Sequence, residues 1–93
     1  MALLSKEEIG QNTEKLDGWK YSNNQIEKIY ELKDFKSALG FINQIGEEAE
    51  KMDHHPDIFL YSYNKVKITL STHSEGGVTG NDFKLAEIIE NLA

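Results

Sequence analysis

Hydrophobic residues recur along this chain at helical and at alternating spacings, which together predict three helices and four strands. The first helix has Ile9 and Leu16 on one face. Ser5 and Glu8 have the spacing of a capping box, so we expect this helix to begin after Ser5 and to end near Asp17.

A longer second helix is expected after Asp34, because aspartate is a favourable N-cap residue. Its apolar positions recur at helical spacing, at Phe35, Ala38, Leu39, Ile42, Ile45, Ala49 and Met52. The opposite face carries the polar residues Lys36, Asn43, Glu47 and Glu50. The only proline, Pro56, cannot continue a helix, so the chain should leave the helix at residues 53–55.

Four segments with the composition of strands predict two hairpins. Residues 19–21 and 26–32 flank an Asn-Asn turn and form the first hairpin. Residues 58–63 and 66–71 flank a turn centred on residues 64–65 and form the second, which then gains one continuous apolar face. Its cross-strand pairs would be Tyr63 with Val66, Tyr61 with Ile68 and Phe59 with Leu70.

The same register, extended to the open end of the second hairpin, places His73 beside Pro56. Directly opposed residues in an antiparallel ladder have Cα atoms about 4.5–5.5 Å apart. His73 should therefore lie against His54 and His55, which precede the proline. The sequence thus predicts that its three histidines meet.

Residues 74–77 are expected to form a flexible loop before a last helix. Thr79 and Asp82 form a capping box with Asp in place of Glu, and the helix should run to Leu92. Its apolar stripe is wider than one contact face requires, and consists of Phe83, Leu85, Ala86, Ile88, Ile89 and Leu92. We therefore expect part of this stripe to pack against another subunit.

The order of the predicted elements is helix, two strands, helix, two strands, helix. This order favours an α+β fold, a two-layer sandwich in which helices cover one face of a four-stranded antiparallel sheet. The 93 residues, of which 39% are hydrophobic, are enough for one core. A single domain over residues 1–93 is expected.

Composition excludes several classes of function. The chain has no cysteine, which rules out disulfides and thiol nucleophiles. Its net charge is −6 and all ten basic residues are lysines, so it lacks the arginine fork that reads guanine and phosphate, and we expect no direct contact with nucleic acid. The start lacks the layout of a signal peptide and no apolar run is long enough for a membrane, which favours a cytoplasmic location.

The three histidines, with Glu50, Asp53 and Asp82 near them in the predicted fold, are the strongest candidates for chemistry. Imidazole can give and take protons near neutral pH, so converging histidines predict an acid/base site. The alternatives are histidines that only suit a helix C-terminus, and a zinc site of three imidazoles and a carboxylate. The spacing lacks a helical His-x-x-x-His pair and adjacent histidines rarely point at one ion, so we expect no metal.

Two residues allow both a structural and a functional interpretation. Asp82 can accept a hydrogen bond from the Thr79 amide as part of a helix cap, and can serve a proton-transfer site as well. Trp19 is of a type that usually packs in the core, although its ring could stack on a flat heterocycle.

A family resemblance rests on the spacing of these residues. Glu50 is followed after three residues by His54-His55-Pro56, then after six, nine and eight residues by Tyr63, His73 and Asp82. This pattern resembles the signature of the pterin-4a-carbinolamine dehydratases, and the similarity extends from about Ser5 to Leu92. The flanking segments Gly18-Trp19, Tyr63-Asn64-Lys65-Val66 and Ile68-Thr69-Leu70-Ser71-Thr72-His73 also resemble that family.

The resemblance implies that the chain converts 4a-hydroxytetrahydropterin to quinonoid dihydropterin and water, the step that recycles tetrahydrobiopterin after aromatic amino-acid hydroxylation. The reaction needs an acid to assist loss of hydroxide from C4a and a base to remove the proton from N5. By analogy, His54 and His73 would be these acid/base groups, and His55 would bind and orient the pterin. No metal or redox cofactor is implied.

The resemblance also implies roles for the neighbouring residues. Asp53 and the segment Ser71-Thr72-His73-Ser74 would surround the pterin ring, while Glu50 and Asp82 would orient the imidazoles. Ser74 stands where some relatives carry an acidic residue. The predicted catalytic residues are His54, His55, His73 and Asp82, and the predicted substrate-binding residues are Glu50, Asp53, His54, His55, Ser71, Thr72, His73, Ser74 and Trp19.

The alternative function is a non-catalytic interaction module. Animal members of the family that this chain resembles also act as dimerisation cofactors of a homeodomain transcription factor. The resemblance further implies a homodimer or homotetramer and a functional link to an aromatic amino-acid hydroxylase, without nucleic-acid or membrane contact.

Overall fold

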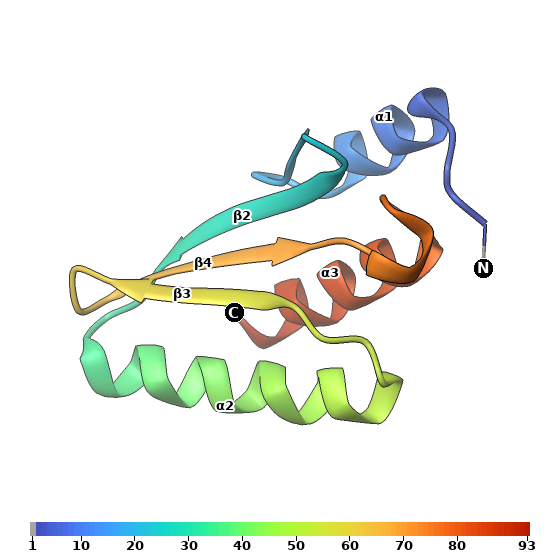
Figure 1. Ribbon diagram of the computed structural model, residues 1–93. Coiled ribbons are helices and arrows are strands. Elements are labelled where there is room, and N and C mark those ends of the chain that lie inside the picture. Colours follow the sequence, from blue (N-terminus) through green and yellow to red (C-terminus); the bar gives the residue numbers. More distant parts are fainter. Residues whose placement is uncertain (1) are drawn as a thin grey trace.

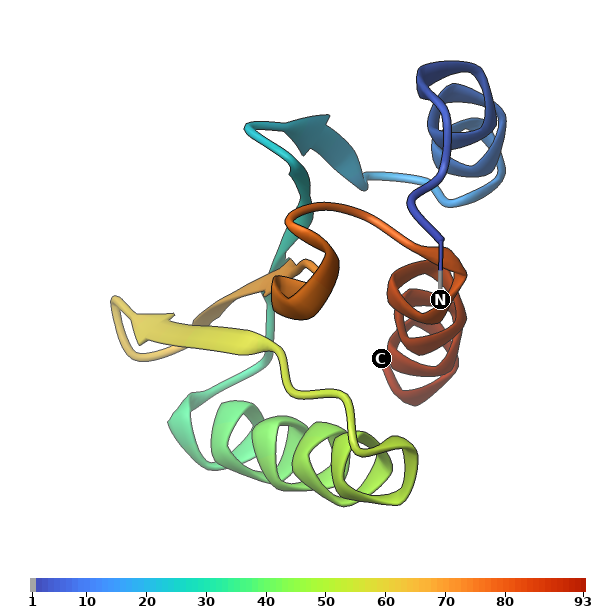
Figure 2. The ribbon, with the colours of Figure 1, turned by 45° about the vertical axis from the view of Figure 1, so that its right-hand side comes forward.

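The computed structural model of this chain describes residues 2–93 and contains a four-stranded antiparallel sheet with three helices on one side (Figures 1 and 2). The predicted α+β fold and the predicted order of elements are confirmed. The elements are α1 (Lys6–Lys15), β1 (Lys20–Ser22), β2 (Gln25–Glu31), α2 (Phe35–Met52), β3 (Asp57–Tyr61), β4 (Lys65–Leu70), the 3₁₀ turn η1 (His73–Glu75) and α3 (Gly80–Leu92).

The sheet has the strand order β1-β2-β4-β3, so β4 is central and β3 is an edge. The helix α2 carries the chain from β2 to β3 and leaves room for β4 between them (Figure 1). Val66, Ile68 and Leu70 of β4 are fully buried, and they lie opposite Tyr30, Lys28 and Ile26 of β2 respectively. The core therefore lies between this face of the sheet and the helices.

The helix α2 begins at the predicted cap, where the Asp34 side chain accepts a hydrogen bond from the Ser37 amide at 2.7 Å. Its buried residues are Ala38, Phe41, Ile45 and Ala49. Phe35 and Leu39 were expected on the apolar face, but they lie at its margin and are 50% and 42% exposed. Phe41 was not among the predicted apolar positions of α2. It is buried because the face of α2 that points to the core is centred nearer to Phe41 than to Phe35 or Leu39.

The helix α3 packs against α2, and its capping box at Thr79 and Asp82 is present as predicted. Its wide apolar stripe is largely buried within the chain, at Phe83, Leu85, Ala86 and Ile89. The neighbouring helix and the sheet thus account for the width of the stripe, and a partner subunit is not needed to explain it.

The predicted register of the second hairpin is wrong by three residues. Ile58 pairs with Ile68, Leu60 with Val66 and Tyr61 with Lys65, and the turn consists of residues 62–64. Because a shift by an odd number exchanges the two faces of a strand, Ile58 and Leu60 point to the core and Phe59 and Tyr61 point away from it.

Two features explain this register. Asn64 is tied to the residue after β2 by two hydrogen bonds. Its side-chain Nδ2 donates to the Leu32 carbonyl at 2.9 Å, and its main-chain carbonyl accepts from the Leu32 amide at 2.8 Å. The outward residues are also apolar: the rings of Phe59 and Tyr61 stack with centroids 5.1 Å apart. Alternation alone could not tell the two faces of β3 apart.

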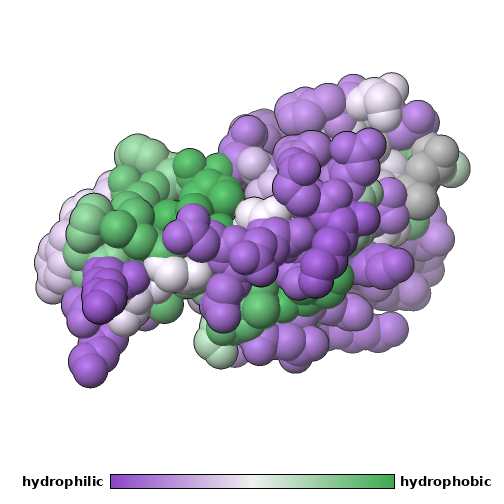
Figure 3. Space-filling model, turned by 90° about the horizontal axis from the view of Figure 1, so that it is seen from below, coloured by the Kyte–Doolittle hydropathy of each residue, from purple (hydrophilic) through white to green (hydrophobic). Residues whose placement is uncertain are grey.

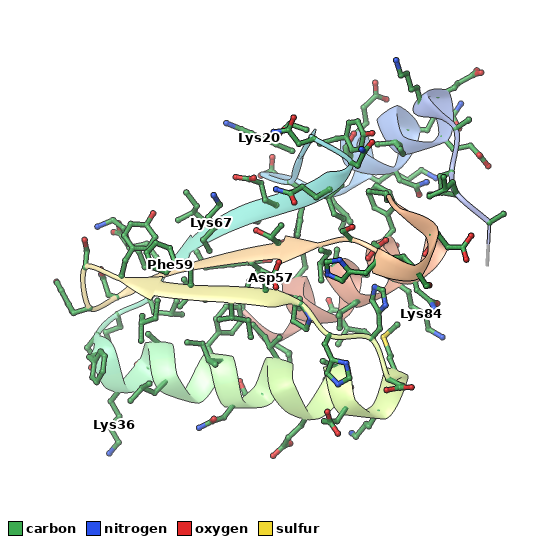
Figure 4. All side chains as sticks on the ribbon, in the orientation of Figure 1. Lys20, Lys36, Asp57, Phe59, Lys67 and Lys84 are labelled. Atoms are coloured by element: carbon green, nitrogen blue, oxygen red, sulfur yellow. The ribbon has the colours of Figure 1, made fainter. Side chains whose placement is uncertain are left out.

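The face of the sheet that points away from the helices is mixed in character (Figure 4). Phe59 lies beside Lys67, and Lys67 forms an ion pair with Glu27 at 3.4 Å. Lys20 pairs with Glu27 across the β1–β2 ladder. Within residues 2–93, no helix is both long and apolar enough to cross a membrane.

A partly buried polar cluster fastens α3 to the sheet. Glu90 of α3 accepts hydrogen bonds from the Trp19 indole at 3.1 Å, the Lys28 ammonium at 2.6 Å and the Tyr30 hydroxyl. Burial alone would raise the pKa of Glu90, but these donors and the charge of Lys28 outweigh it and lower the pKa below its usual value. Burial, reinforced by Glu90, raises the pKa of Tyr30.

The Glu90 cluster predicts an acid-dependent part of the stability. A carboxyl whose pKa is lower in the folded state stabilises the protein above its unfolded pKa, about 4, and this contribution is lost as the pH falls through the folded value. We expect Glu90→Gln to lower the free energy of unfolding by about 1–2 kcal/mol at neutral pH and to flatten its fall between about pH 5 and 3, as measured by urea titration. The matched variant Glu87→Gln, at an exposed position of α3, should keep the wild-type profile, and identical profiles for Glu90→Gln and wild type would contradict this role.

Candidate active site

The end of α2 turns His54 toward the start of α3. Asp53 adopts the left-handed conformation, with φ 50° and ψ 44°, and its amide donates to the carbonyls of Ala49 and Glu50. The His54 amide also donates to the Ala49 carbonyl, at 3.1 Å. The helix therefore ends where Pro56 predicted, and the chain leaves it with the His54 side chain nearly buried, 11% exposed.

Asp82 is the centre of the site. Its carboxylate is completely buried at the third position of α3. Oδ2 accepts hydrogen bonds from the Thr79 amide and the Thr72 hydroxyl, both at 2.8 Å, and Oδ1 lies 2.6 Å from Nε2 of His54. The capping role that the sequence predicted for Asp82 is confirmed, and the same carboxylate contacts a histidine.

These contacts explain how a carboxylate can be buried in a chain that has no arginine to pair with it. A buried carboxylate is strongly unfavourable unless hydrogen bonds replace its hydration. Here donors come from three segments: the end of α2, the residue after β4 and the N-cap of α3. An ionised carboxylate only accepts hydrogen bonds, so the Nε2 atom of His54 must carry the hydrogen between them.

His73 reaches this neighbourhood by a different route from the one predicted. The β3–β4 ladder pairs Asp57 with Thr69 and β4 ends at Leu70, so it does not place His73 beside Pro56. Thr72 instead forms an isolated bridge with Gly77, and His73 begins the turn η1 as an exposed residue. The Thr72 hydroxyl and the His54 ring share the Asp82 carboxylate, and His73 is the next residue after Thr72, with its Cα about 3.8 Å from the Cα of Thr72.

His55 and Glu50 form a second, exposed pair. Nε2 of His55 lies 2.7 Å from Oε1 of Glu50, and their side chains are 58% and 77% exposed. They border an open groove of about 870 Å³ between α2 and the start of β3, which Ala49, Pro56 and Ile58 line with apolar surface. A flat organic ring could enter this groove without displacing the core.

The remaining candidates lie in different surroundings. Asp53 and Ser74 are exposed, and Ser71 is half-buried after the end of β4. Trp19 is buried, and its indole N–H is occupied by Glu90, so the structure does not join it to the histidines. Among residues 2–93, no three histidine, aspartate or glutamate side chains are arranged to hold a metal ion.

Sequence analysis named Thr72 as a substrate-binding residue and Thr79 as a helix cap, but it did not predict the contact between their hydroxyls or the bond from Thr72 to Asp82. The hydroxyls of Thr72 and Thr79 lie 2.8 Å apart, and the Thr72 hydroxyl also bonds to Asp82. Thr79 carried a signal as an N-cap, but the contact of its hydroxyl with Thr72 depends on how the chain leaves β4. Chemically, an imidazole held by a buried carboxylate is suited to giving and accepting a proton at its other nitrogen.

Comparison with known proteins shows which family this chain resembles along nearly its whole length. The sequence profile of the family described as pterin 4 alpha carbinolamine dehydratase matches residues 2–92. A protein of Sulfolobus acidocaldarius, provisionally named a pterin-4-alpha-carbinolamine dehydratase, is 44% identical over 89 residues, which is 96% of this chain and 97% of the relative. A protein of Cyanothece sp. with the same provisional name is 45% identical over 91 residues, covering 98% and 93% of the two chains.

Solved structures show the same fold. The crystal structure of a transcriptional coactivator/pterin dehydratase from Brucella Melitensis has a TM-score of 0.93 at 41% identity and covers 98% of each chain. A pterin dehydratase-like protein described as a RuBisCO assembly factor in the alpha-carboxysome has a TM-score of 0.66 over 81% of this chain. At 17% identity, this second similarity shows the fold alone.

The contacts of Asp82 predict the effect of removing its charge. In Asp82→Asn the remaining oxygen can accept from Thr72 and Thr79, but the amide N–H₂ then faces Nε2 of His54. Charge-assisted bonds become neutral ones, and we expect the free energy of unfolding to fall by about 1–3 kcal/mol in urea titrations at neutral pH. Asp53→Asn is the control, because Asn tolerates the left-handed conformation of that exposed position. If the two variants lose the same free energy of unfolding, the charge of the buried carboxylate does not contribute the stability expected of it.

Proposed function

This chain belongs to the family of pterin-4-alpha-carbinolamine dehydratases, and we propose that it removes water from a 4a-hydroxytetrahydropterin to give the quinonoid dihydropterin. The observation that carries the proposal is the contact of 2.6 Å between His54 and Asp82, whose side chains are 11% and 0% exposed. It supplies an oriented imidazole where the reaction needs a proton to move.

In the proposed mechanism His54 and His73 are the acid/base groups. A protonated imidazole gives its proton to the C4a hydroxyl, which leaves as water when the C–O bond breaks. A neutral imidazole removes the proton from N5, and the N5 electron pair forms the new double bond to C4a. Protons are conserved, since one is donated and one is accepted, and no electron is gained or lost.

The substrate-binding residues follow the same proposal. His55 binds and orients the pterin, and its pair with Glu50 holds the imidazole at the border of the groove. Asp53 and the segment from Ser71 to Ser74 surround the ring, with Asp82 orienting His54. The contact of Trp19 with Glu90 favours packing for that residue instead of stacking on the pterin.

The physiological setting remains a prediction. A 4a-hydroxytetrahydropterin is formed when a reduced pterin supplies electrons for aromatic hydroxylation, so tetrahydrobiopterin recycling beside an aromatic amino-acid hydroxylase is the expected context. A cytoplasmic location, expected from the sequence, is part of the same proposal. The mechanism proposed for these residues uses no cofactor.

We propose that the chain assembles as a homodimer or homotetramer. The surface that suggests this assembly is not the apolar stripe of the last helix, which the sequence pointed to. Phe35 and Leu39, on successive turns of α2, are 50% and 42% exposed, while Phe59 and Tyr63 at the same end are 60% and 63% exposed. The space-filling view shows hydrophobic residues gathered at the end of the molecule where α2 begins (Figure 3). Contiguous exposed apolar surface of this kind favours association with a second copy.

This surface also keeps the second candidate function open. The similar structure from Brucella Melitensis is described as a transcriptional coactivator as well as a pterin dehydratase. A non-catalytic dimerisation module would use the apolar end of α2 and would not need the His54–Asp82 contact. Dehydration by the purified chain without a partner protein separates the two functions.

The acid/base assignment predicts the behaviour of two variants. His54→Ala and His73→Ala should each lower kcat for carbinolamine dehydration by about 10²–10⁴-fold, the range that general acid–base catalysis supplies. The assay follows the loss of a synthetic 4a-hydroxytetrahydropterin by ultraviolet absorbance. Glu75→Ala, at an exposed position of η1, is the control for damage to that turn and should retain activity. A wild-type rate in His73→Ala would remove that residue from the mechanism.

The assembly proposal predicts a change of mass. At micromolar concentration, light scattering of the wild-type chain should give a multiple of the 10.6 kDa chain mass. The double variant Phe35→Glu/Leu39→Glu should give the monomer mass, because it places two charges in the proposed contact. Ile29→Glu is the control, since Ile29 is 51% exposed on the open face of the sheet. A wild-type mass of 10.6 kDa would rule out the assembly.

A further inference from the structure

A row of hydrogen bonds runs inward from the N-cap of α3 to the His54 ring. Thr79 is completely buried, and its hydroxyl lies 2.8 Å from that of Thr72. The Thr72 hydroxyl lies 2.8 Å from Oδ2 of Asp82, and the other oxygen of Asp82 contacts His54. The Thr72 side chain is therefore engaged with the protein interior.

The hydrogens of this row can be assigned from the chemistry of its members. A threonine hydroxyl has one hydrogen to donate, and an ionised carboxylate has none. Thr72 must therefore give its hydrogen to Asp82, which leaves Thr79 as the donor to the Thr72 oxygen. All the hydrogens of the row then point toward Asp82, and Oδ2 receives two donors when the Thr79 amide is included.

This arrangement fixes the orientation of the carboxylate. With Oδ2 engaged by Thr72 and Thr79, the lone pairs of Oδ1 remain for Nε2 of His54. The neutral His54 ring then carries its hydrogen on Nε2 and a free electron pair on Nδ1. None of residues 2–93 forms a hydrogen bond with Nδ1 of His54, so Nδ1 is the atom left to exchange a proton with a substrate.

We propose that Thr72 is a positioning residue, which acts through Asp82 to hold His54 in the Nε2–H tautomer with Nδ1 directed to proton transfer. This assigns the Thr72 side chain a different task from the pterin contact that the sequence suggested. The inference rests on the proposed dehydratase function for its kinetic consequence, but the state of the His54 ring can be measured without any substrate.

The kinetic test uses the full chain and three variants with a 4a-hydroxytetrahydropterin as substrate. Thr72→Val keeps the shape and removes the donor, so kcat should fall about tenfold or more while KM stays within about twofold. Thr72→Ser restores the hydroxyl and should return kcat to within about threefold of wild type. Thr69→Val, on the outer face of β4, is the matched control and should leave both constants unchanged.

The spectroscopic test follows the ¹⁵N chemical shifts of the His54 ring at about pH 9, where imidazoles are neutral. The wild-type spectrum should show the Nε2–H tautomer. In Thr72→Val the carboxylate is held by one donor fewer and fixes the ring less firmly, so some of the neutral rings turn away from Asp82 and carry their hydrogen on Nδ1, which shifts the resonances toward that tautomer.

The outcomes separate the two proposals. A rise of KM with unchanged kcat in Thr72→Val would show that the hydroxyl binds the pterin, and unchanged constants would show that it does neither; each result overturns the positioning role. If Thr72→Val does not fold, an Nδ1–H tautomer in the wild-type spectrum still overturns it. Absence of dehydration by the wild-type chain would refute the proposed function alone, because the tautomer measurement would still decide the role of Thr72.

Discussion

The burial of one carboxylate organises the functional end of this protein. Asp82 is completely removed from solvent, and such a group is tolerated only when hydrogen-bond donors replace its hydration. Thr79 and Thr72, three and ten residues before Asp82, and His54, 28 residues before it, supply those donors. The contact therefore joins the end of α2, the exit from β4 and the start of α3, and it fixes an imidazole as a consequence.

Fold and chemistry depend on the same few groups. The left-handed Asp53 ends α2 and releases His54, and the capping box of α3 presents the Asp82 carboxylate at its first turn. A second carboxylate, the partly buried Glu90, fastens the other half of α3 to β2. With α3 held at both points, His54 is oriented by the scaffold, as expected for a group that must transfer a proton with little reorganisation.

Local signals in the sequence predicted the elements well, and the non-local contacts much less well. Caps at Ser5, Asp34 and Thr79 and the proline after α2 act over a few residues, so each could be recognised directly. The β3–β4 register failed because β3 is apolar on both faces and because Asn64 is fixed by Leu32, 32 residues away. His54 and Asp82 were predicted as site residues, whereas the inward turn of the Thr72 hydroxyl follows from the exit of β4 and has no local signal.

The most direct test is a crystal structure of the chain with a bound reduced pterin. The central claim is that the imidazole held by Asp82 and the imidazole of His73 act on C4a and N5 of that ring. We predict that the ring lies with Nδ1 of His54 and the His73 side chain within hydrogen-bond distance of these positions. A pterin bound out of reach of His54, with the His54–Asp82 contact intact, would contradict the account.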